Sequence, residues 1–131
     1  MKSFLKHSRF ALIYSLIVIT LCALPGDSMP SFDFMDLFSF DKIAHMVAFG
    51  ILCILTGIAL AKHFHFSYMR KYVLHLTLAY CLFLGAATET GQAYLAIHRS
   101  GDWLDFIADT MGIIAGIILF LLIYSRKPVT I

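Results

Sequence analysis

The stretch from residue 89 to residue 109 gathers ionisable side chains that could act together in one site. They are Glu89, Arg99, Asp102, Asp105 and Asp109. A second polar set lies upstream and consists of Asp41, Lys42 and His45. Carboxylates beside an imidazole suit general acid–base catalysis, and a guanidinium group suits phosphate because it donates two parallel hydrogen bonds. The residue types therefore predict a site for a phosphorylated or hydrogen-bonding ligand.

The spacing of these residues places them on shared helical faces. Asp41 and His45 are four residues apart, and Glu89 and Gln92 are three apart, so each pair shares a face of a helix. Downstream, one stripe recurs at intervals of three or four residues and contains Asp102, Asp105, Asp109, Gly112 and Gly116. Its two glycines form a GxxxG pattern, which lets helices approach closely. The stripe is therefore predicted to face the interior of a helix bundle.

The composition indicates lipid as the solvent for these helices. The chain has 131 residues, of which 60% are hydrophobic and 14% charged, with a mean hydropathy of +0.85. A soluble domain usually has about 25% charged residues. The net charge of +2, with no basic stripe, argues against nucleic acid as a partner. Residues 1–131 are expected to form a single domain.

Four apolar segments are expected to form helices, at about residues 10–24, 43–61, 72–92 and 103–124. A helix needs about 20 mainly apolar residues to cross a bilayer. The first segment is the shortest, but no small-residue cleavage site follows it, so a retained helix is predicted, with a cleaved signal peptide as the alternative. Residues 31–41, where phenylalanines alternate with aspartates, are expected to form a flap at the membrane interface. The predicted fold is all-α, a four-transmembrane-helix bundle.

The charges separate by sign between the two sides of this bundle. Eight of the ten basic residues lie before the first segment, between the second and third, or after the fourth, and no acidic residue accompanies them. All eight acidic residues lie on the other side, with Lys42 and Arg99. The excess of lysine and arginine marks the cytoplasmic side. Both termini are therefore predicted to be cytoplasmic, with the polar site at the outer face.

Depth in the membrane favours a functional site. Asp109 follows the interfacial anchor Trp103 by six residues, or roughly 9 Å along a helix. An ionisable group at that depth is costly, and it suggests a function by default. Candidate catalytic residues are His45, Glu89 and Asp105. Candidate ligand-binding residues are Asp41, Lys42, Gln92, Arg99 and Asp109. No metal site or cofactor is predicted from ligand spacing, although His45, Glu89 and Asp105 could hold a divalent cation.

The segments "DKIAHMVAFGIL" and "ETGQAYLAIHRSGDWLDFIADTMGIIAG" closely resemble the VanZ-like family of bacterial membrane proteins. The shared pattern covers roughly residues 35–120 and consists of Asp41, Lys42, His45, Glu89, Gln92, Arg99, Asp105, Gly112 and Gly116. The chain departs from it at Asp109, where many members have asparagine. The resemblance implies a multi-pass protein of the bacterial cytoplasmic membrane. It also implies a link to the cell envelope and to resistance against glycopeptide antibiotics of the teicoplanin type.

Three classes of function follow from these residues. The site could bind membrane lipids, either a lipid headgroup or a lipid-linked cell-wall precursor, with Arg99 and Lys42 on phosphate. It could instead belong to a membrane enzyme that modifies an envelope lipid, with His45 as general base. In the third alternative the charges only hold the helices together. Geometry separates these classes, because an open polar cavity favours the first two and a closed ionic network favours the third.

The charge separation generates a test of orientation. Single cysteines placed at Ser31 and Ser67, in a chain whose own cysteines are replaced, are expected to differ in labelling by a membrane-impermeant maleimide. Ser31 should react in intact cells, and Ser67 should react only after the membrane is permeabilised. Labelling of Ser67 but not Ser31 in intact cells would reverse the assignment.

Overall fold

The computed structural model describes residues 2–23, 34–62, 68, 71–95 and 103–124. Within these residues the long regular elements are α-helices, as the sequence predicts. They are α1 (Lys2–Ala23), α2 (Phe34–Ala61), α4 (Val73–Leu95) and α5 (Trp103–Tyr124). The chain is therefore an all-α protein with four long helices.

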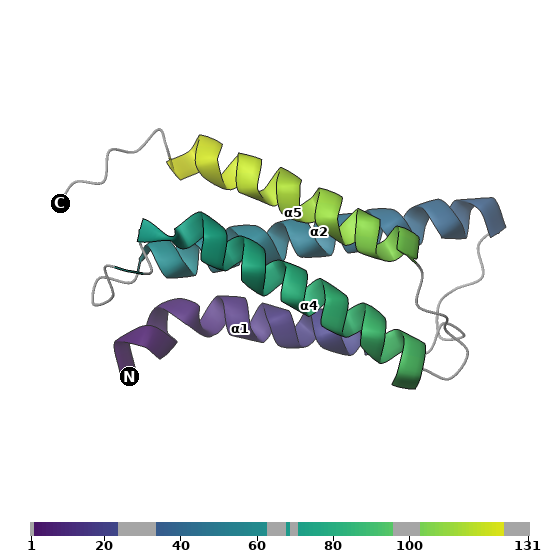
Figure 1. The fold of residues 1–131 in the computed structure, drawn as a ribbon, viewed down its shortest axis with the longest axis horizontal. Coiled ribbons are helices and arrows are strands. Elements are labelled where there is room, and N and C mark those ends of the chain that lie inside the picture. Colours follow the sequence, from purple (N-terminus) through teal and green to yellow (C-terminus); the bar gives the residue numbers. More distant parts are fainter. Residues whose placement is uncertain (1, 24–33, 63–67, 69–70, 96–102, 125–131) are drawn as a thin grey trace.

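The four helices lie side by side along one axis and form a bundle (Figure 1). α2 and α5 run in the same direction, while α1 and α4 run in the opposite direction (Figure 1). The end of α1, the start of α2, the end of α4 and the start of α5 therefore meet at one end of the bundle, on the right in Figure 1. We call this the polar end, because it carries the ionisable residues described below. The most extensive contact joins α2 to α5.

Three of the helices are long and apolar enough to cross a membrane. The candidate spans are Lys42–Ala61, Val73–Tyr94 and Trp103–Tyr124, with 20, 22 and 22 residues. At about 1.5 Å per residue these lengths match the hydrocarbon core of a bilayer, roughly 30 Å thick. Large apolar side chains such as Leu16 and Phe83 are exposed on the bundle surface. Such a surface suits lipid, so the protein is embedded in a membrane.

Two helices begin earlier than the apolar segments predict. α1 starts at Lys2 rather than near residue 10, although its apolar part, Ser8–Ala23, is shorter than the three spans. α2 starts at Phe34, so residues 34–41 are helical and continue into the span, where the sequence suggested a separate flap. Neither proline nor glycine interrupts residues 34–49. Helical hydrogen bonds do not require an apolar segment, so a helix can extend past the membrane boundary.

The α2–α5 contact depends on the small residues of α5. A Cβ atom added at Gly112 would overlap the backbone carbonyl of Met46, and one added at Gly116 would lie 2.6 Å from the carbonyl oxygen of Gly50. The two backbones therefore touch directly, as the GxxxG pattern predicts. Next to this contact lies the core, in which α2, α4, α5 and α1 contribute Phe49, Leu52, Cys53, Cys81, Leu84, Ile113 and Val18.

Replacement of Gly112 tests this contact. Gly112→Ala is expected to lower the thermal unfolding temperature in detergent by several degrees, because its methyl group meets backbone rather than a flexible side chain. The matched control is Gly91→Ala on α4, where an added Cβ has no atom within 4 Å. The control should unfold like the wild type. Equal unfolding temperatures for both variants and the wild type would contradict the close approach.

Candidate polar site at one end of the helix bundle

Three ionisable residues lie inside the candidate membrane spans, each a few residues from the end of its span. His45 is three residues from the start of its span, Glu89 is five from the end of its span, and Asp109 is six from the start of its span. These offsets correspond to roughly 5–9 Å along the helices. The three residues come from α2, α4 and α5, whose ends meet at the polar end (Figure 1). The helix arrangement therefore brings them into one layer.

His45 and Asp109 form the inner polar contact between α2 and α5. The Nδ1 atom of His45 lies 2.9 Å from Oδ1 of Asp109, and the two side chains are only 6% and 1% exposed. With its proton on Nδ1, the imidazole donates to the carboxylate. The pair adjoins the backbone contact, because His45 precedes Met46 and Asp109 lies one turn before Gly112. The close approach of the two backbones thus sets this distance.

Lys42 and Asp105 form a second contact between the same helices, one turn nearer the helix ends. Lys42 Nζ donates to Asp105 Oδ1 at 3.2 Å, with side chains 22% and 7% exposed. Each residue lies three or four positions before its counterpart in the inner pair, so the two contacts form successive rungs between α2 and α5. Asp105 is therefore the partner of Lys42, and Asp109 is the carboxylate that contacts the imidazole.

Glu89 reaches the inner pair from α4. One ligand atom each from His45, Glu89 and Asp109 lies within 4.8 Å of the other two. Both carboxylate oxygens of Glu89 are shielded from solvent, although the residue as a whole is only partly buried. The carboxylate is therefore turned inward. The cluster of these three residues, which we call the triad, combines one imidazole with two carboxylates.

Gly85 makes room for this arrangement, and sequence reasoning did not single it out. A Cβ atom added at Gly85 would lie 3.4 Å from Oδ2 of Asp109. α4 therefore passes close to the Asp109 side chain, one turn before Glu89. The available signal was the spacing of four residues between Gly85 and Glu89, which places both on one face of α4.

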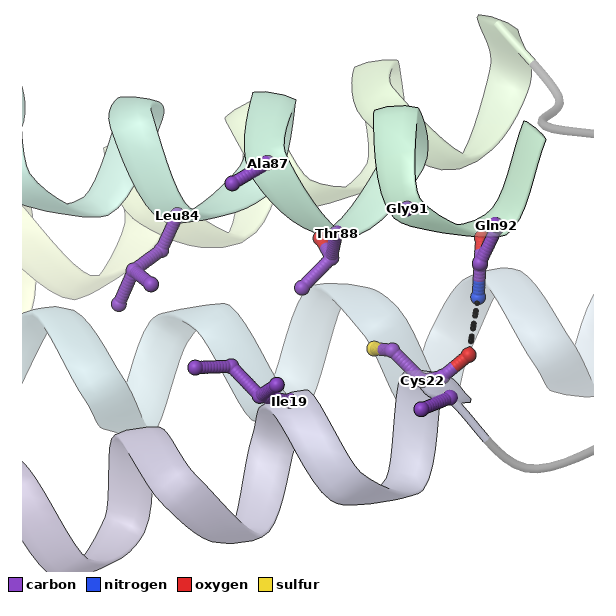
Figure 2. Close-up of a pocket in the computed structure, with 8 residues that line it drawn as sticks. Ile19, Cys22, Leu84, Ala87, Thr88, Gly91 and Gln92 are labelled. Carbon is purple, nitrogen blue, oxygen red and sulfur yellow. Dashed lines mark hydrogen bonds between the residues drawn. The ribbon is translucent and has the colours of Figure 1, made fainter. Parts of the chain in front are cut away.

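Gln92 lies on another side of α4, against α1. Its Nε2 atom donates to the backbone carbonyl of Cys22 at 2.8 Å (Figure 2). That carbonyl belongs to the last turn of α1, where carbonyl groups lack partners within the helix. Gln92 also lines a mostly apolar pocket of about 410 Å³ between α1 and α4 (Figure 2). The side-chain amide therefore ties two helices together at the polar end.

A surface groove lies between α4 and α5, and Glu89 of the triad is one of its lining residues. Its volume is about 340 Å³, and it is lined by Ala86, Glu89, Thr90, Ala93, Tyr94, Trp103 and Phe106. Tyr94 and Trp103 are 84% and 80% exposed, which suits the aromatic side chains that gather at membrane interfaces. Glu89 thus borders the groove while its carboxylate faces His45 and Asp109. It links an apolar surface groove to a buried polar cluster.

The remaining predicted site residues cannot be placed in this geometry. Arg99 and Asp102 lie outside the described residues. Asp41 belongs to α2, but its side chain is not among those described. The ligand-binding roles of Arg99 and Asp41 stay predictions from the sequence.

Comparison with known proteins agrees with the resemblance noted in the sequence. The model of the VanZ/LLP1 family matches residues 2–124, a range that includes all four helices and every residue of the triad. No curated protein and no solved structure matches the chain. Because the family match covers nearly the whole sequence, the chain belongs to the VanZ/LLP1 family.

Proposed function

We propose that this membrane protein binds the headgroup of an envelope lipid, or of a lipid-linked cell-wall precursor, at its polar end. The observation that carries the proposal is the groove between α4 and α5, which borders Glu89. Its walls are largely apolar, and a polar cluster lies behind one of its wall residues. A lipid has the same division, with apolar chains attached to a polar headgroup, and can enter from the side without leaving the membrane.

The charges indicate which headgroups suit the site. Three carboxylates whose side chains are described lie at the polar end, those of Glu89, Asp105 and Asp109, and the last two contact Lys42 and His45. Carboxylates accept hydrogen bonds from hydroxyl and amino groups. Sugar or peptide groups would therefore contact Glu89 once its shielded carboxylate turned from the triad toward the groove, while phosphate requires Arg99 or a rearranged Lys42. On the charge separation described above, the polar end faces outward from the bacterial cytoplasmic membrane.

The alternative that the charges only hold the helices together accounts for four of the polar residues. Lys42 with Asp105, and His45 with Asp109, are paired between α2 and α5 and support the packing of those helices. Glu89 differs because it comes from α4 and borders the groove. The proposal therefore assigns ligand contact chiefly to Glu89. A connection to teicoplanin-type resistance would follow if the bound precursor were one that the antibiotic also recognises.

Lipid binding can be tested by native mass spectrometry of the purified protein with bacterial lipid extract. The wild type should retain a specific lipid. Glu89→Gln should weaken that binding by about tenfold or more, or 1.4 kcal/mol, since it removes the charge and keeps the size. Ala93→Phe should also weaken it, because the ring fills the groove without replacing a polar residue.

The matched control for lipid binding is His75→Ala. His75 is an exposed residue of α4 near the opposite end of the bundle. This variant should retain the same lipid as the wild type. The same lipid bound equally by the wild type, Glu89→Gln and Ala93→Phe would refute the proposed site.

The His45–Asp109 contact favours a second candidate function, hydrolysis of an envelope lipid. Asp109 would orient the imidazole, and His45 would take a proton from the attacking water. Glu89, in its protonated form, would give a proton to the leaving oxygen. An aspartate that orients a histidine base is a recurring catalytic arrangement.

Turnover distinguishes an enzyme from a binding protein. If the site is catalytic, wild-type protein incubated with bacterial lipids should produce a new headgroup species detectable by lipid mass spectrometry. His45→Gln should abolish the product but still retain the lipid, because proton transfer contributes typically 10²–10⁴-fold to a rate. Retention of lipid without any product by the wild type would leave binding as the function and exclude this candidate.

A further inference from the structure

We propose that His45, Glu89 and Asp109 form a site for one divalent metal ion of the zinc or manganese class. The inference goes beyond lipid binding and does not depend on it. It changes the role of His45, since an imidazole nitrogen bound to a metal cannot also act as a general base. The sequence suggested that His45, Glu89 and Asp105 could hold a divalent cation, and the structure groups Asp109 with His45 and Glu89.

The first support is the distance between the ligand atoms. One atom from each residue lies within 4.8 Å of the other two. Ligands bound to zinc at about 2.0–2.1 Å lie roughly 3.3 Å from one another in a tetrahedral site. Side-chain rotations that bring the ligand atoms closer by up to about 1.5 Å would therefore close the triad around an ion. The rest of the coordination sphere would be filled by water or by a ligand atom.

The second support is the chemistry of the donor set. Imidazole favours zinc and other transition metals, while carboxylates also suit manganese and magnesium. A mixed set of one imidazole and two carboxylates therefore favours zinc or manganese over magnesium or calcium. It differs from a patch of acidic residues on a surface, which attracts cations without a defined geometry. His45 and Asp109 are both buried, at 6% and 0% exposure.

The third support is charge balance inside the membrane. Glu89 and Asp109 are two carboxylates inside the candidate membrane spans. A charge in the hydrocarbon region is costly unless it is compensated. A divalent cation with a neutral imidazole and two carboxylates has no net charge, so the ion would balance both acids at once.

The fourth support is the rigidity of the helices that position the ligands. His45 and Asp109 flank the contact between Met46 and Gly112, where the backbones of α2 and α5 touch. Gly85 allows α4 to approach Asp109 one turn before Glu89. Metal sites on packed helices hold their ligands more accurately than sites on loops. The triad is therefore held close to binding geometry before an ion arrives.

The test measures metal binding directly, without lipid and without an activity. Protein carrying a tag without histidine, with His63 and His65 replaced by alanine to remove a competing pair, is stripped with chelator. Zinc, manganese and magnesium are then titrated by calorimetry, and bound metal is measured by mass spectrometry. We expect one equivalent of zinc or manganese per chain and a higher unfolding temperature in its presence, with a smaller effect of magnesium.

Variants of equal shape identify the ligands. Asp109→Asn and Glu89→Gln should each weaken binding of the preferred ion by more than about tenfold. The matched control is Asp105→Asn, which makes the same change on the same helix one turn away, in the outer rung. It should bind the metal as the wild type does. Asp109→Asn removes a charge from an α2–α5 contact and could prevent folding. Glu89 belongs to neither α2–α5 contact, so Glu89→Gln still tests the site in that case.

Cobalt provides an independent reading of the site. Cobalt(II) in place of zinc should give visible absorption bands. Their intensity should be that of a cobalt ion with few ligands, here nitrogen and oxygen atoms. Those bands should persist in Asp105→Asn and disappear in Glu89→Gln. The proposal is overturned if the wild type binds no stoichiometric zinc or manganese, or if Asp105→Asn and Glu89→Gln bind the metal equally well.

Discussion

The contact between the backbones of α2 and α5 is the constraint on which the rest of the structure depends. It exists because Gly112 and Gly116 have no side chain to separate the helices. In a membrane, the hydrophobic effect does not drive helices together, since lipid is as apolar as leucine, so close packing supplies much of the attraction. The contact fixes the rotation and the axial register of both helices. The positions of the two polar contacts between α2 and α5 follow from that register.

The polar residues follow from this register as two rungs. His45, directly before Met46, contacts Asp109, one turn before Gly112, and one further turn along each helix Lys42 contacts Asp105. The inner rung is almost fully buried and the outer rung is partly exposed. Because buried charges require partners, the rungs also oppose a slip of one helix past the other. The outer rung stabilises the packing of α2 against α5, and the inner rung lies next to Glu89 of α4.

α4 adds a third residue to the inner rung and forms one wall of the α4–α5 groove. Glu89 places its carboxylate beside the inner rung and also borders the α4–α5 groove. A cation in the triad and a headgroup in the groove would therefore meet at one residue. The open coordination positions of such a cation would be available to the oxygen atoms of a phosphate or a sugar. Lipid binding in the groove and metal binding in the triad are therefore proposed for neighbouring sites, and neither proposal depends on the other.

The sequence alone determined the apolar parts of the four helices, the buried stripe of α5 and the family, because hydropathy and the period of 3.6 residues are local properties. It did not determine that α1 begins at Lys2 and α2 at Phe34. It did not determine which carboxylate contacts the imidazole. Residues three positions apart differ by roughly 60° around a helix, so Glu89 and Gln92 can face different neighbours. Only packing decided that Gln92 contacts α1 and Glu89 the triad, since partners depend on how whole helices rotate and tilt against one another.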